Sequence, residues 1–69
     1  MADVKFYLNG EEREVPDKTD LTRVIQLFLL PEKRVAIEVN GEVVRRSQWP
    51  FVFVGRNDKI EVVHFVGGG

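Results

Sequence analysis

Two Asn-Gly dipeptides divide this chain of 69 residues, and each follows a run in which apolar and polar residues alternate. Asn9-Gly10 comes after the run 4–8, and Asn40-Gly41 comes after the run 35–39. The dipeptide favours a two-residue type I′ turn, because both central residues of that turn need positive φ. The sequence therefore predicts two β-hairpins, one at the start of the chain and one just past its middle.

The period-2 alternation assigns a face to each strand. Val4, Phe6 and Leu8 share one face of the first strand, and Val35, Ile37 and Val39 share one face of the strand before the second dipeptide. The first hairpin returns through the polar run 11–16, which ends at Pro16 because proline cannot donate to a β-ladder. The second hairpin returns through Val43-Val44.

An amphipathic helix is predicted between the hairpins. Its apolar stripe has the spacing i, i+3, i+4, i+7 and consists of Leu21, Val24, Ile25 and Phe28. Thr19 or Asp20 is suited to cap its start. Pro31 disfavours helical geometry at the preceding residue, so we expect about three turns ending near Leu29.

The last third of the chain supplies a lid, a turn and a final strand. Trp49 is predicted to close the core, with its indole N–H donating to a carbonyl group. An apolar run, 51–54, and a tight turn, 55–58, precede a final strand with Ile60 and Val62 on its inner face. We predict one core made of Val4, Phe6, Leu8, Leu21, Ile25, Phe28, Ile37, Val39, Ile60 and Val62. The fold class is α+β, a sheet with one helix packed across it.

Composition excludes several functions. A chain of this length forms one domain. It has no cysteine and one histidine, which argues against disulfides, thiol chemistry and a metal cluster. Ten basic and 11 acidic residues give no positive excess for nucleic acid. No long apolar span or signal segment is present, so we expect a cytoplasmic protein that does not bind membranes.

The residues after the final strand, Gly67, Gly68 and Gly69, have no side chains to pack. A run of glycines suits a tail that enters a narrow channel, and its terminal carboxylate is ionised at neutral pH and is an oxygen nucleophile. A frayed end or a linker remnant is the alternative. Val63 and Phe65 alternate with the inner-face residues, so together with Val66 they are predicted to form a docking surface beside the tail, unless a loop covers them.

Four segments together resemble the ThiS family of sulfur-carrier proteins: 39–44, 46–49, 58–63 and the terminal glycines. The resemblance covers essentially the whole chain. It implies a β-grasp fold related to ubiquitin and MoaD, with a mixed sheet of about four to five strands whose last strand is central and parallel to the first. It also implies a domain over residues 1–66 followed by a flexible tail, 67–69.

The resemblance further implies a carrier rather than an enzyme. An adenylyltransferase related to ubiquitin-activating enzymes would adenylate Gly69, the residue that is modified. Sulfur relayed from a cysteine desulfurase would then give a thiocarboxylate, and thiazole synthase would use that sulfur in thiamin biosynthesis. Gly67 and Gly68 would enter the partner's channel. The chain has no phosphate-cradling loop, so ATP would be supplied through the activating enzyme.

Two positions depart from the family pattern. Asn57 stands where the family usually has glycine, and asparagine tolerates left-handed geometry. Gly67 adds a third glycine. Other functions stay open on the sequence: a sulfur carrier for molybdopterin or another product, a ubiquitin-like modifier of lysines, or an interaction module whose glycines are incidental. A stand-alone enzyme is disfavoured, because no nucleophile–base pair accompanies the carboxylates of Asp58 and Glu61.

Overall fold

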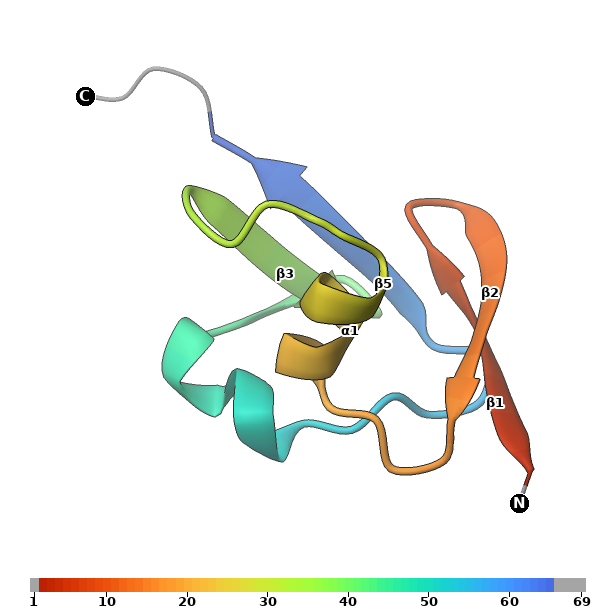
Figure 1. The fold of residues 1–69 in the computed structure, drawn as a ribbon. Coiled ribbons are helices and arrows are strands. Elements are labelled where there is room, and N and C mark those ends of the chain that lie inside the picture. Colours follow the sequence, from red (N-terminus) through yellow and green to blue (C-terminus); the bar gives the residue numbers. More distant parts are fainter. Residues whose placement is uncertain (1, 66–69) are drawn as a thin grey trace.

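The computed structural model describes residues 2–65, which form a five-stranded mixed sheet with one α-helix across one face (Figure 1). In chain order the elements are β1 (Asp3–Leu8), β2 (Glu11–Pro16), α1 (Leu21–Leu27), β3 (Val35–Val39), β4 (Glu42–Val44), the 3₁₀ helix η1 (Arg46–Phe51) and β5 (Lys59–His64). The predicted α+β class and single helix layer are confirmed. Neither helix in this part of the chain is long and apolar enough to cross a membrane.

The last strand lies at the centre of the sheet, whose order is β2-β1-β5-β3-β4. β5 runs parallel to β1, with Leu8 opposite Ile60, and antiparallel to β3 over the register from Val35↔His64 to Val39↔Ile60. The predicted central position of the last strand, parallel to the first, is therefore confirmed.

Both Asn-Gly dipeptides form the turns that the sequence predicts. Asn9 and Gly10 have φ values of 51° and 84°, and Asn40 and Gly41 have 53° and 88°. All four values are positive, as a type I′ turn requires. Leu8 pairs directly with Glu11, so the first loop contains two residues.

Asp20, rather than Thr19, caps the start of α1. The Asp20 carboxylate accepts a hydrogen bond from the N–H of Arg23 at 2.9 Å, which satisfies one free donor of the first turn. Thr19 is buried, and its hydroxyl donates to the Pro16 carbonyl at 2.6 Å. Thr19 therefore fixes the loop before the helix.

The predicted end of the helix is wrong: α1 contains seven residues and stops at Leu27, about two turns rather than three. Leu29 has a φ of 55°, and this left-handed residue ends the helix. The N–H of Leu30 donates to the Ile25 carbonyl and that of Leu29 to the Gln26 carbonyl, as in a Schellman motif. The apolar stripe extends past the helix because the side chain of Phe28, the C-cap, still packs against the core.

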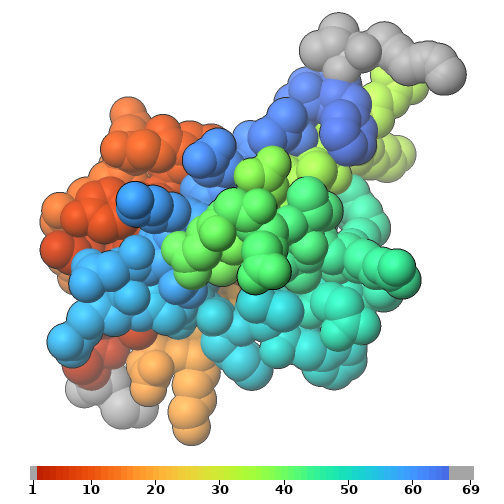
Figure 2. All heavy atoms as spheres, turned by 180° about the vertical axis from the view of Figure 1, so that it is seen from behind, coloured from red at the N-terminus to blue at the C-terminus, as the bar shows by residue number. Residues whose placement is uncertain are grey.

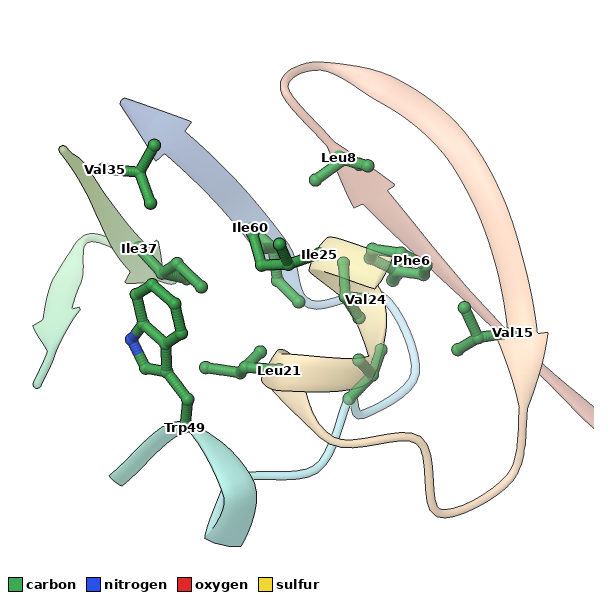
Figure 3. Close-up of a cluster of buried hydrophobic side chains, with 11 residues drawn as sticks. Phe6, Leu8, Val15, Leu21, Val24, Ile25, Val35, Ile37, Trp49 and Ile60 are labelled. Carbon is green, nitrogen blue, oxygen red and sulfur yellow. The ribbon is translucent and has the colours of Figure 1, made fainter. Parts of the chain in front are cut away.

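The core lies between α1 and the sheet (Figure 3). The predicted core residues are confirmed, although Val4, Phe28, Val39 and Val62 are only partly buried. Five further apolar residues are buried there: Val15, Val24, Val35, Trp49 and Val54. Trp49 is 3% exposed, and its indole N–H donates to the Val44 carbonyl at 3.0 Å, so the predicted lid is confirmed.

Candidate functional site: the central strand and its outer face

The predicted site residues divide between β5 and the segment that follows it. The predictions for Val66, Gly67, Gly68 and Gly69 lie outside the described residues. The described part of the site is thus β5 and the sheet face that contains Val63. Its geometry is determined by how β5 is held on each side.

The side chain of Asn40 holds the start of β5 from the β3–β4 turn. Its amide oxygen accepts from the Lys59 N–H at 2.9 Å, and its amide nitrogen donates to Asp58 Oδ1 at 3.0 Å. The Asn40 backbone N–H adds a bond to the Lys59 carbonyl at 2.7 Å. The other carboxylate oxygen of Asp58 accepts from the Gly55 N–H at 2.7 Å, which connects this contact to the turn before the strand.

Asn9 makes the equivalent contact from the other side. Its backbone N–H donates to the Ile60 carbonyl at 2.9 Å, and its amide oxygen accepts from the Val62 N–H at 2.8 Å. The side chain thus continues the hydrogen bonding to β5 beyond the last β1–β5 residue pair, Leu8↔Ile60. Sequence reasoning missed both asparagine contacts, because turn propensity is a local signal and Val62 lies 53 residues from Asn9.

The turn before β5 has the predicted form. Asp58 N–H donates to the Gly55 carbonyl at 3.1 Å, and Asn57 has a φ of 64°, so asparagine does occupy the left-handed position. The Asn57 N–H donates to the Lys5 carbonyl at 2.8 Å, which connects the turn to β1. The strand therefore begins from a segment bound to both neighbours.

The outer face of the sheet is the face opposite α1, seen from behind in Figure 2. It carries three exposed apolar residues, Val43, Val63 and Phe65, which are termed the apolar patch. Val63 lies opposite Ala36 and is 44% exposed, whereas Phe65 is 53% exposed. Val43, on β4, is 67% exposed. The N–H of Phe65 donates to the Arg34 carbonyl at 2.7 Å, so pairing with the β3 side continues past the end of β5. Within residues 2–65 the covering loop that was the alternative is not found.

A hollow of about 250 Å³ adjoins this face beside the β1–β5 residue pairs. Its lining consists of Tyr7, Gly10, Lys59, Ile60 and Glu61. The described residues contain no group of three or more His, Asp or Glu side chains placed to hold a metal ion. The chemistry that this surface offers is recognition, through an apolar patch and flanking charges.

A mixed five-stranded sheet with a central last strand parallel to the first, and one helix across it, defines the β-grasp class of small ubiquitin-like proteins. The fold agrees closely with the crystal structure of the thiamine biosynthesis protein ThiS from Geobacter metallireducens. The TM-score is 0.83 at 26% identity, over 96% of this chain and 100% of that one.

The ThiS family matches residues 6–69, nearly the whole chain and including the terminal glycines. The sulfur carrier protein ThiS of Bacillus subtilis is 33% identical over 63 residues, which are 90% of this chain and 96% of that protein. The chain belongs to the ThiS family of sulfur-carrier proteins.

Longer relatives are also similar. A thiazole synthase of Magnetococcus marinus is 43% identical over 67 residues, and one of Paramagnetospirillum magneticum is 35% identical over 66 residues. In each case the match covers 96% of this chain but 20% of the relative, so this chain spans a fifth of the length of those proteins.

Proposed function

We propose that this protein carries sulfur for the thiazole ring of thiamin as a thiocarboxylate on Gly69. The family match carries the proposal, because it extends through the glycines to residue 69. The names of two relatives, both thiazole synthases, favour the thiazole pathway over molybdopterin or lysine modification. In this function the chain is a carrier and co-substrate, and its partners perform the catalysis.

In the proposed sequence a partner adenylyltransferase binds ATP and receives the glycine segment. A carboxylate oxygen of Gly69 attacks the α-phosphorus and pyrophosphate leaves, which gives an acyl-adenylate. A persulfide relayed from a cysteine desulfurase displaces AMP and gives an acyl disulfide. A second thiol of the partner then reduces that S–S bond, and thiazole synthase takes the sulfur from the released thiocarboxylate. Gly67 and Gly68 provide a backbone without Cβ atoms, which suits a channel that excludes side chains.

The geometry of β5 supports delivery of this segment. The central strand is bonded to β1 and β3 and is held by Asn9 and Asn40, so its direction is fixed relative to the rest of the sheet. Val63 and Phe65 lie exposed just before the glycines. We propose that these two residues, together with Val66, dock the activating enzyme while the glycines reach its reaction centre.

Removal of Gly69 tests the proposal. The reactive carboxylate would then be one residue short, which is about 3.3 Å of extended chain, whereas a misplacement of about 1 Å is enough to lower a rate on the order of a hundredfold. Gly68→Val should fail separately, because its β-branched side chain meets the channel wall. The assay is pyrophosphate release by the purified activating enzyme. Adenylation of either variant at the parent rate would contradict the proposal.

A second measurement uses the protein from its own cells. The intact mass shows whether the chain ends at Gly69 and whether one terminal oxygen has been exchanged for sulfur. Isopeptide conjugates to lysines, in place of a free thiocarboxylate, would instead support a protein modifier.

A further inference from the structure

On the outer face of the sheet, most of the charged strand residues are acidic. Strand register puts side chains opposite one another on this face in the pairs Lys5↔Glu14, Tyr7↔Glu12 and Glu38↔Glu61, with Lys59 beside Tyr7. Within β1, β2, β3 and β5, the charged residues on this face are Asp3, Lys5, Glu12, Glu14, Glu38, Lys59 and Glu61. Five of them are carboxylates and two are lysines, whereas the whole chain is close to neutral, with a formal net charge of −1. Arg34 lies opposite Phe65, just before β3 begins.

Glu38 and Glu61 form a like-charge pair at the centre of this face. They lie directly opposite on β3 and β5, where Cβ atoms are typically about 5 Å apart and equal charges are destabilising. The ion pair found among residues 2–65 is Arg13–Glu11, so neither carboxylate has a cation within 4 Å in that part of the chain. Charges on edge strands discourage aggregation. Because β3 and β5 are interior strands, that role does not explain this pair of carboxylates.

The acid pair borders the apolar patch. Val43 lies opposite Glu38 on one side, and the Ala36↔Val63 pair is the next outward-facing row along β3 and β5. Protein interfaces commonly combine an apolar centre with arginine anchors. A guanidinium group has five N–H donors in a planar fork, so one arginine can bond to two neighbouring carboxylates at once.

We propose that this face docks a basic surface of the activating enzyme, with one arginine of that enzyme bridging Glu38 and Glu61. The partner's identity rests on the proposed function, whereas its chemistry follows from the adjacent carboxylates of Glu38 and Glu61. A second copy of this chain would place carboxylates against carboxylates. Nucleic acid and anionic membranes carry the same sign of charge and would be repelled. The basic occupant also relieves the repulsion that the free chain tolerates.

The test measures the affinity for the activating enzyme and the thermal midpoint of the free chain. Removal of either carboxylate should lower the affinity but not the thermal midpoint. Glu61→Gln and Glu38→Gln should each weaken binding to the purified activating enzyme about tenfold or more in calorimetry, since each removes a charged partner of a desolvated arginine. The same changes should leave the thermal midpoint of the free chain unchanged or raise it, because they remove repulsion. Glu42→Gln is the matched control, because Glu42 pairs with the inward-facing Val39 and is not on this face. Its affinity should equal that of the parent.

Several results would overturn the proposal: unchanged affinity of both glutamine variants, a fall in thermal midpoint that parallels the loss of binding, a parent chain that does not bind the enzyme, or self-association through this face.

The variant lacking Gly69 separates this proposal from the carrier function. If that variant is adenylated normally while Glu61→Gln binds weakly, the carrier function fails and the docking surface stands. If it is inactive while Glu61→Gln binds normally, the docking surface fails and the carrier function stands.

Discussion

Asn9 and Asn40 each combine a local role with a long-range one. Both occupy a left-handed turn position, and both amide oxygens accept a hydrogen bond from β5. The turn role is predictable, because Asn-Gly is a strong hairpin signal. The bond to β5 is not predictable, because it depends on which strand lies beside the turn. The same limit applies to Glu38 and Glu61, whose side chains are neighbours only in the register of the folded sheet.

Substitution of Asn9 separates these two roles. Asn9→Gly keeps positive φ accessible but removes the acceptor for the Val62 N–H, so we expect a loss of about 0.5–1.5 kcal/mol in the free energy of unfolding. Asn9→Asp is the control, since it retains an acceptor oxygen and tolerates the left-handed region. Urea denaturation measures stability, and hydrogen exchange at the Val62 amide reports the bond itself. Equal protection of that amide in the glycine variant would show that the bond is unimportant.

At the scale of elements, the start of α1 was predictable and its end was not. A capping aspartate before an apolar stripe is a clear signal, and Asp20 fulfils it. The end depends on Leu29, which adopts φ of 55° although leucine disfavours that region. Nothing in the sequence marks a leucine for this conformation; the bonds of Leu29 and Leu30 to the last turn hold it there. With seven residues, α1 depends on packing rather than on helix propensity.

Leu29→Gly should stabilise the domain modestly. A left-handed residue with a Cβ atom costs about 1–2 kcal/mol, whereas the greater freedom of glycine in the unfolded chain offsets about 0.4–1 kcal/mol of the gain. We expect a net gain on the order of 0.5 kcal/mol, seen as a higher thermal midpoint. Leu29 is 90% exposed, so little packing is lost. Leu29→Ala keeps the backbone strain and should show no gain; a glycine variant no more stable than the alanine variant would refute this explanation.

For the whole molecule, alternation predicted which faces of the strands are buried but not which strands are neighbours. Hairpins specify the pairs β1–β2 and β3–β4, but the position of β5 between them depends on contacts between distant segments. The family resemblance supplied that order. The outward direction of Val63 followed from the parity of β5 alone, because Ile60 fixes the inner face.

Phe65→Asp tests the apolar part of the docking surface. The side chain is 53% exposed, so the fold should persist. Binding to the activating enzyme should weaken about tenfold or more if Phe65 is one of the few residues that dominate the interface. Phe51→Asp makes the same chemical change on η1, which packs with α1 on the other side of the sheet, and Phe51 is 72% exposed. Calorimetry should find parent affinity for that control, and equal affinities of both variants would exclude the patch.

The central position of β5 also determines how the domain responds to mechanical force. A pull on the C-terminal end of β5 acts along the strand, perpendicular to the bonds that connect it to β3 over five residue pairs and to β1 over two. These bonds are loaded in shear and must break together, whereas bonds pulled along their own direction break one at a time. In the proposed function, this arrangement lets a partner draw the segment after β5 into its channel without unravelling the sheet. A protease motor that pulls from the C-terminal end meets its greatest resistance at β5, which is the first strand that it reaches.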